Sequence, residues 1–178
     1  MKNLLFLFIA LTSLISCSEL EPRKPVNIPE SSFLESSVAR NRNIMKKEQK
    51  LFKEIIARDS TLEYQLNKSG FWYAYKLKTK DRVFPKRGDF VRFNYKIEDL
   101  KGTLLYDEME LGTVDYLVDK EELLPALREA IKLLSINEVA TFLFPSYLCY
   151  GYQGDGEKVD INQALRFTIK LTSHSVKN

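Results

Sequence analysis

Side chains that perform covalent or metal chemistry are scarce in this chain. Its 178 residues include one histidine, His174, and two cysteines, Cys17 and Cys149. His174 lies four residues from the C-terminus, where chains are usually loosely held. A serine or cysteine nucleophile commonly relies on a histidine base, and a zinc site needs several Cys or His ligands at short spacing. We therefore expect neither kind of centre, no metal and no cofactor.

The first cysteine follows a targeting signal. Lys2 supplies a positive charge, and residues 4–11 form an unbroken apolar run, which is typical of a signal peptide. The run is too short for a permanent membrane helix, which needs about 20 apolar residues. Residues 14–17 (LISC) resemble a bacterial lipobox, which predicts cleavage before Cys17 and lipidation of its thiol. The alternative is an ordinary secretory signal beside a chance cysteine.

This interpretation divides the first part of the chain. Residues 1–16 are expected to be the lipoprotein signal peptide. Residues 17–30, which contain three of the six prolines, are expected to form a flexible tether after the lipidated Cys17. Cys149 is then left without an intramolecular partner. Its neighbours at 142–150 are largely apolar, so we expect a buried structural thiol.

Composition indicates a folded domain that does not bind nucleic acid. Hydrophobic residues make up 44% of the chain and aromatic residues 12%, enough to fill a core. The net charge of +3 is small, and the basic residues are scattered, which is typical of a solvated surface.

The pattern becomes helical at residue 32. Ser32 and Glu35 have the spacing of a capping box, and apolar residues then recur at helical spacing up to Ile56. We expect an amphipathic helix from Ser32 to Arg58, with a possible break at 41–43, in a helical segment at 31–68. Its apolar stripe either docks on the rest of this chain, which we favour, or associates with a second copy.

After Ser69 and Gly70 the pattern changes to period two. The expected strands are 71–78, 90–97, 103–106, 113–118, 138–144 and 165–171. Pro125 can begin a short helix whose apolar face contains Leu127 and Ile131. Many short strands and one short helix predict an α+β fold, with an antiparallel sheet wrapped over that helix.

Five segments in this order resemble the FKBP-type peptidyl-prolyl isomerases. They are 84–95 (FPKRGDFVRFNY), 104–107 (LLYD), 123–131 (LLPALREAI), 144–151 (FPSYLCYG) and 162–167 (NQALRF). The resemblance implies an isomerase domain at 69–178. The segments 127–133, 141–147 and 150–155 are more closely similar to the gliding-motility-associated FKBP-type lipoproteins of Bacteroidetes. That similarity implies an envelope protein, anchored through Cys17 at the periplasmic side of the outer membrane.

The resemblance also implies roles for residues of this chain. Tyr150 would donate its hydroxyl to the carbonyl before the proline, and Asp107 would orient polar groups near the amide. The other implied residues are the walls Tyr95, Tyr106 and Phe167, the rim Leu123 and Leu124, and the floor Leu127. The implied partners are proline-containing polypeptides. Each aromatic residue could instead only pack the core, and Asp107 could be a solvated carboxylate.

Isomerising an X-Pro bond suits this inventory. Its barrier of about 18–20 kcal/mol is the loss of amide resonance, so an apolar pocket and a few hydrogen bonds suffice without a nucleophile or a metal. Leu127 departs from the family's tryptophan, and Ser146 and Cys149 replace a proline and an alanine. We therefore also consider a non-catalytic chaperone or binding module, and a purely structural anchor.

Overall fold

The computed structural model describes residues 30–176. Two long elements frame it, helix α2 at the beginning of the described part and strand β7 at its end. The elements in chain order are α2 (Glu30–Arg58), β1 (Gln65–Leu66), β2 (Trp72–Leu77), β3 (Phe90–Asp99), β4 (Leu104–Tyr106), α3 (Glu108–Leu111), β5 (Val114–Leu117), α4 (Pro125–Ile131), β6 (Val139–Phe144), the 3₁₀ turn η1 (Ser146–Leu148) and β7 (Leu165–Ser175).

The chain divides into two units, residues 1–37 and residues 38–178. Of the first, the structure describes only the opening turns of α2. The second contains the remainder of α2 and every strand, and both of its apolar clusters lie between Phe52 and Leu171. The predicted signal peptide, Cys17 and the tether lie outside the described residues. Among residues 30–176 no helix has both the length and the apolarity to cross a membrane.

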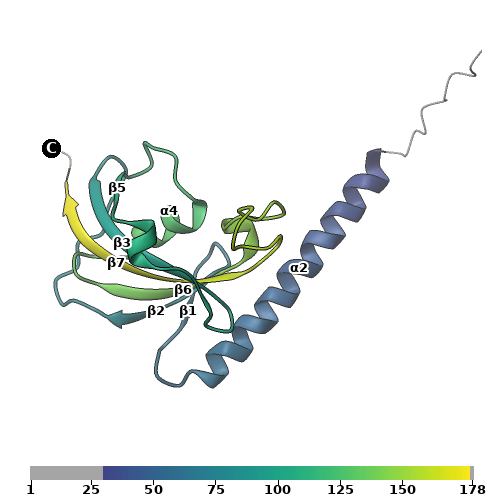
Figure 1. The fold of residues 1–178 in the computed structure, drawn as a ribbon, viewed down its shortest axis with the longest axis horizontal. Helices are drawn as coiled ribbons and strands as arrows, with labels where there is room; N and C mark the ends of the chain where they lie inside the picture. The colour runs from purple at the N-terminus through teal and green to yellow at the C-terminus, as the bar shows by residue number, and fades with distance from the viewer. Residues whose placement is uncertain (1–29, 177–178) are drawn as a thin grey trace, which may run out of the picture. The chain divides into compact units, whose positions relative to one another are not determined.

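The seven strands form one antiparallel sheet in the order β1-β2-β6-β7-β3-β4, with β5 also paired to β3. Figure 1 shows this sheet curving around α4. Along β3 the side chains of Val91, Phe93 and Ile97 alternate into the core, as period two requires. The predicted α+β class and sheet are confirmed. The sequence pattern missed β1, α3 and η1.

The main core lies between the sheet and α4. Pro125 occupies the first turn of α4, where its missing N–H costs no hydrogen bond. The helix then buries Leu127 and Ile131 against sheet residues that include Phe142 and Phe167. A short helix is enough here, because burial of these side chains stabilises it far more than its own propensity does.

A second, smaller cluster joins the end of α2 to the opposite face of the sheet. Phe52 is fully buried against Leu143 and Ala164, with Trp72 beside them. Because successive strand residues point to opposite faces, Leu143 faces α2 while its neighbour Phe142 belongs to the main core. The C-terminal half of α2 therefore docks on its own domain, as we favoured. The helix is continuous through 41–43.

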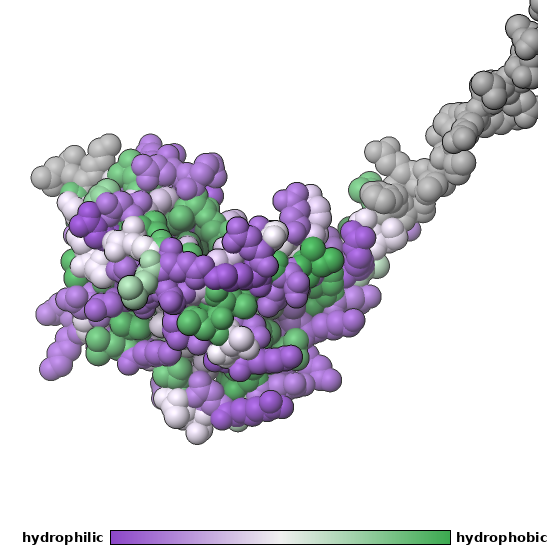
Figure 2. Space-filling model, in the orientation of Figure 1, coloured by the Kyte–Doolittle hydropathy of each residue, from purple (hydrophilic) through white to green (hydrophobic). Residues whose placement is uncertain are grey.

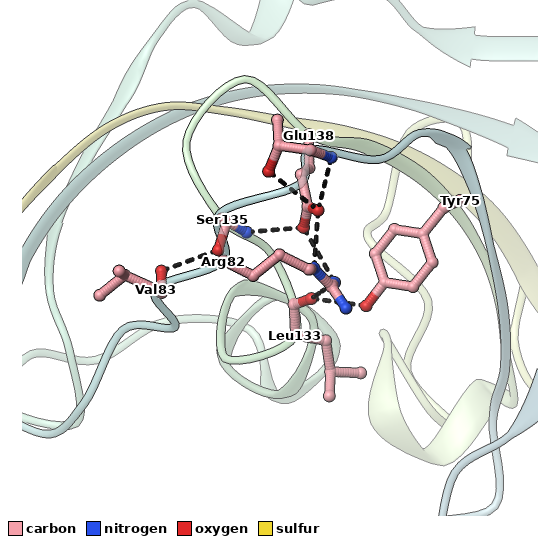
Figure 3. A network of polar contacts seen from close by, with 7 residues as sticks. Tyr75, Arg82, Val83, Leu133, Ser135 and Glu138 are labelled. Carbon is pink, nitrogen blue, oxygen red and sulfur yellow. Dashed lines mark hydrogen bonds and ion pairs between the residues drawn. The ribbon is translucent and has the colours of Figure 1, made fainter.

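A buried ion pair holds the loop after β2 against the turn before β6 (Figure 3). Glu138 is fully buried and accepts two hydrogen bonds from Arg82, at 2.7 and 2.9 Å. It also accepts the backbone N–H of Ser135 at 2.9 Å, and Tyr75 donates its hydroxyl to the carbonyl of Leu133 at 2.7 Å. Burial by itself would raise the pKa of Glu138, but the hydrogen bonds of Arg82 and of Ser135 hold it below its ordinary value.

The predicted end of the helix at Arg58 is confirmed. Two other expectations need correction. The last part of the segment 31–68 is not helical, because residues 59–68 hold β1, which pairs with β2. His174 is not loose, because β7 continues to Ser175 and pairs there with β3. The His174 side chain is buried, and its Nε2 lies 2.8 Å from a carboxylate oxygen of Asp89.

Candidate functional site

The base of the candidate site is part of the main core. Leu127 of α4 and Phe167 of β7 are both buried. The ring of Tyr95, from β3, stacks on Phe167 with the centroids 5.9 Å apart and the planes 20° apart. Tyr95 itself is half-buried, so it extends this aromatic floor toward the surface. The predicted floor and two of the predicted walls therefore lie together.

Tyr150 is placed by the 3₁₀ turn η1 and the residues after it. Cys149 and Gly151 both donate their backbone N–H to the carbonyl of Ser146, at 3.0 and 2.9 Å, which closes the chain tightly around Tyr150. Gly151 has a φ of +59°, a conformation that L side chains rarely adopt. The turn thus fixes the direction of Tyr150.

The hydroxyl of Tyr150 is available to a ligand as a donor. Burial first, and then the neighbouring Tyr95 and Asp155, raise the pKa of Tyr150 well above its usual range. The hydroxyl therefore keeps its proton at neutral pH. Between residues 30 and 176 no hydrogen bond joins it to a protein group. Tyr95, Tyr106 and Tyr150 all pack against the main core, which includes Leu127 and Phe167.

Asp155 joins Tyr106 to the glycine-rich loop after Tyr150. Tyr106 donates its hydroxyl to Oδ2 of Asp155 at 2.5 Å. Oδ1 of Asp155 accepts the backbone N–H groups of Glu157, Lys158 and Val159 at 2.8–3.0 Å. Partial burial alone would raise the pKa of Asp155, but these hydrogen bonds lower it. The hydrogen bond between Tyr106 and Asp155 also raises the pKa of Tyr106 to about 12.

Asp107, which the resemblance implied would orient polar groups near the amide, directly follows Tyr106 and begins α3. It is exposed, and its Oδ1 accepts the backbone N–H of Glu110 at 2.7 Å as the N-cap of α3. The carboxylate that acts on the ionisation of Tyr150 is that of Asp155. The sequence analysis gave Asp155 no role. The available signal was an aspartate between Gly154 and Gly156, where a side chain can accept loop N–H groups.

Leu123 and Leu124 form the rim directly before α4. Both are half-buried and pack against the main core. Leu124 is the N-cap of α4, and its carbonyl accepts the N–H of Arg128 at 3.1 Å. Within the described part of the chain, neither leucine donates its own backbone N–H to a protein acceptor, so these two donors are available to a ligand.

The remaining chemistry at the site is limited. Cys149 is buried, and burial followed by the nearby Glu48 carboxylate raises the pKa of its thiol far above the usual range. A thiol held in this state is a poor nucleophile. Over the stretch from 30 to 176, no group of three or more His, Cys, Asp or Glu residues is arranged to hold a metal ion. The site offers an apolar floor, aromatic walls and hydroxyl and N–H donors.

The sequence is similar to those of two known isomerases. The FkpA protein of Neisseria meningitidis serogroup B, described as a probable FKBP-type peptidyl-prolyl cis-trans isomerase, is 30% identical over 112 residues, or 63% of this chain and 37% of that protein. Human FKBP9, a peptidyl-prolyl cis-trans isomerase, is 28% identical over 90 residues, or 50% and 16%. The chain thus spans little more than a third of the length of the Neisseria meningitidis protein.

Solved structures have the same fold. A peptidyl-prolyl cis-trans isomerase from Pseudomonas syringae pv. tomato superposes with a TM-score of 0.60 at 16% identity, covering 76% of this chain and 96% of that one. FkpA from Escherichia coli gives 0.60 at 18% identity, covering 98% and 82%. The family model described as FKBP-type peptidyl-prolyl cis-trans isomerase matches residues 81–172. This chain therefore belongs to the FKBP-type peptidyl-prolyl cis-trans isomerase family.

Proposed function

We propose that this chain is an active peptidyl-prolyl cis-trans isomerase for proline-containing polypeptides. The observation that carries the proposal is the packing of Tyr95, Tyr106 and Tyr150 against a core that includes Leu127 and Phe167. Such a site is apolar and half-buried, and the Tyr150 hydroxyl and the N–H groups of Leu123 and Leu124 have no acceptor among residues 30–176.

This arrangement suits rotation about an X-Pro bond. The planar amide is more dipolar than the twisted transition state, so removal of water disfavours the ground state relative to the twist. The Tyr150 hydroxyl would hold the carbonyl before the proline, and an N–H at Leu123 or Leu124 would hold the peptide in register. Tyr95 and Phe167 would enclose the proline ring. Asp107 keeps its predicted role at the amide end as a proposal, with Asp155 as the better-placed carboxylate.

Loss of one hydroxyl tests the proposal. Tyr150→Phe keeps the ring and removes one hydrogen bond, worth about 0.5–1.5 kcal/mol, so the turnover of a short X-Pro peptide should fall several-fold. Tyr73→Phe is the matched control, because it loses a hydroxyl that donates to Gln65 outside the site. A protease-free isomerisation assay measures both. Full activity in Tyr150→Phe would contradict the assigned role.

The pH dependence separates this mechanism from acid–base catalysis. The pKa of Tyr150 is raised and that of Asp155 is lowered, so neither group changes its charge near neutrality. The rate should therefore be nearly constant between about pH 6 and 8. A steep change within that window would show that a titrating group takes part.

For the location we propose the cell envelope, with Cys17 lipidated and the domain on the periplasmic side of the outer membrane. The lipobox-like residues 14–17 support it. Stable anchoring needs more than one acyl chain, because a single chain binds only marginally. Mass spectrometry of the native N-terminus tests the lipidation, and an unmodified Cys17 in a soluble fraction would contradict it.

The similarity of residues 127–133 and 150–155 to gliding-motility-associated lipoproteins supports assigning the chain to that group.

The second candidate is a binding or chaperone module without turnover. Leu127 favours it, because a leucine where many FKBP domains carry tryptophan makes a less filled floor. Exposed apolar side chains on α2, including Leu34 and Val38, support self-association through the helix. Light scattering of the purified protein measures that association. Affinity for proline peptides without any isomerisation would favour this candidate over the enzyme.

A further inference from the structure

A groove of about 490 Å³ lies between α2 and the segment around Tyr150. Eleven residues line it: Asn41, Ile44, Met45, Ser146, Tyr147, Cys149, Tyr150, Gly151, Tyr152, Gln153 and Asn162. None of them is charged, although charged residues make up 29% of the chain. Figure 2 shows apolar surface on this part of α2 among hydrophilic side chains.

The helix wall of the groove is held by polar contacts. Gln49 donates to the carbonyl of Gly70 at 2.6 Å and accepts the indole N–H of Trp72 at 3.0 Å. One turn of helix away from Met45, Glu48 accepts the backbone N–H of Ser146 at 3.1 Å. These bonds tie α2 to β2 and to η1, so this wall is formed before any ligand arrives.

The opposite wall is held in the same way. Tyr147 donates its hydroxyl to the carbonyl of Ser69 at 2.6 Å. Asn162 donates its backbone N–H to the carbonyl of Gly151 at 2.6 Å, closing the loop 151–162. Within this rigid frame, Met45 is 45% exposed and Tyr152 is 76% exposed. The groove therefore presents apolar side chains to solvent from both walls.

Tyr150 belongs to both the groove and the isomerase site. It lines the groove, and it packs against the same core cluster as Tyr95 and Tyr106. The groove therefore adjoins the isomerase site at Tyr150, so a polypeptide held at its proline by Tyr150 can continue into the groove.

We propose that the groove binds the stretch of polypeptide that flanks the isomerised proline, and that it selects an extended, uncharged stretch with apolar or aromatic side chains. An acidic side chain would lose hydration there without gaining an opposite charge. Met45 and the tyrosines offer adaptable contact area. The amides of Asn41, Gln153 and Asn162 match the donors and acceptors of a peptide backbone. The volume is in the range of ligand sites.

This inference rests on the proposed isomerase function, and the test separates the two. The protein is residues 17–178 with Cys17→Ser, which needs no detergent and contains both apolar clusters. The probes are the peptide Ala-Ala-Pro-Phe, the same peptide extended on its N-terminal or its C-terminal side by Leu-Asn-Phe-Gln-Leu, and extended peptides in which Asp replaces both leucines. The ratio of kcat/KM for an extended peptide to that for the short peptide is measured.

At least one uncharged extension should raise kcat/KM about fivefold, as burial of one or two apolar side chains predicts, whereas the Asp-containing extensions should not. Met45→Glu, which places a charge in the groove, should reduce that ratio to below about twofold. Leu77→Glu, at an equally exposed apolar residue outside the groove, should keep it. No gain from either extension, an equal gain with Asp, or a full gain in Met45→Glu would overturn the proposal.

A direct binding measurement keeps the groove testable if no turnover occurs. Fluorescence anisotropy is recorded with a labelled extended peptide in which alanine replaces the proline. We expect binding that Met45→Glu weakens about fivefold and Leu77→Glu leaves intact. Absence of turnover together with this binding would contradict the isomerase proposal and leave the groove proposal intact. Equal binding to the wild type, Met45→Glu and Leu77→Glu would contradict the groove proposal.

Discussion

Glu48 carries a buried charge that the fold only half compensates. Its side chain lies where α2 meets η1 and is 4% exposed. Oε1 accepts the backbone N–H of Ser146, whereas Oε2 has no hydrogen-bond partner among residues 30–176. Burial raises the pKa of Glu48, and the bonds from Ser146 offset only part of the effect. A group with a raised pKa in the folded state lowers stability above that pKa and costs less as the pH falls through it.

Glu48→Gln should therefore stabilise the protein at pH 7. Glutamine keeps an acceptor for Ser146 and removes the buried charge. An unpaired buried acceptor costs about 1–3 kcal/mol, and the new amide N–H₂ recovers only part of it because it also lacks a partner. We expect the free energy of unfolding to rise by about 1–2 kcal/mol, and Tm by about 2–8 °C for a chain of this size.

Urea unfolding at pH 7 and at pH 5 measures the effect. The advantage of Glu48→Gln should be smaller at pH 5, because wild-type Glu48 takes up a proton in the folded state as the pH falls. Glu54→Gln is the matched control at an exposed position of the same helix and should change stability by less than about 0.5 kcal/mol at either pH. Glu48→Ala leaves the Ser146 N–H unpaired and should destabilise by about 1–3 kcal/mol. Equal or lower stability of Glu48→Gln at pH 7, or an advantage independent of pH, would refute this reasoning.

Three further substitutions test the fold and the floor of the site. Phe52→Asp buries an unpaired carboxylate between α2 and the sheet, so stability should fall by several kcal/mol; an unchanged Tm and molecular mass would mean that the helix does not dock there. Arg82→Ala leaves Glu138 charged and buried, with an expected loss of about 3–5 kcal/mol in urea unfolding, and a loss below about 1 kcal/mol would refute the pairing. Leu127→Trp should raise the affinity for an FKBP-directed macrolide, at an overpacking cost of about 1–3 kcal/mol; calorimetry that finds no gain with the fold retained counts against Leu127 as the floor.

The sequence predicted those elements whose burial is periodic. Strand β3 alternates because one of its faces packs on α4, and α2 shows an apolar stripe because Phe52 and Ile55 pack on the sheet. Strand β1 has two residues, both exposed, so it leaves no pattern to detect. Helix α3 exists through its cap at Asp107 and buries no residue. A local hydrogen bond stabilises this helix, so a periodic pattern of apolar residues could not reveal it.

Contacts between residues far apart in the chain could not be predicted from the sequence pattern. His174 looked loose because it is near the terminus, yet it contacts Asp89, 85 residues away. Asp155 and Tyr106 are 49 residues apart, and only the fold brings them together. In contrast, the pattern predicted the elements that hold Tyr95, Leu127 and Phe167, and the family resemblance implied their grouping as walls and floor. The polar partners depend on the topology, which neither source provided.

The hydrogen bond between Glu48 of α2 and Ser146 of η1, here called the joint, links the docking of the helix to the geometry of the site. Glu48 holds the N–H of Ser146, and the carbonyl of Ser146 in turn accepts the N–H groups of Cys149 and Gly151, which flank Tyr150. A change on α2 therefore reaches the site through one residue, Ser146. Natural sequences tend to depart from the most stable choice where function is at stake, and the half-paired carboxylate of Glu48 is such a departure. If the joint sets the direction of Tyr150, Glu48→Gln should preserve turnover while Glu48→Ala lowers it, since only the alanine releases Ser146.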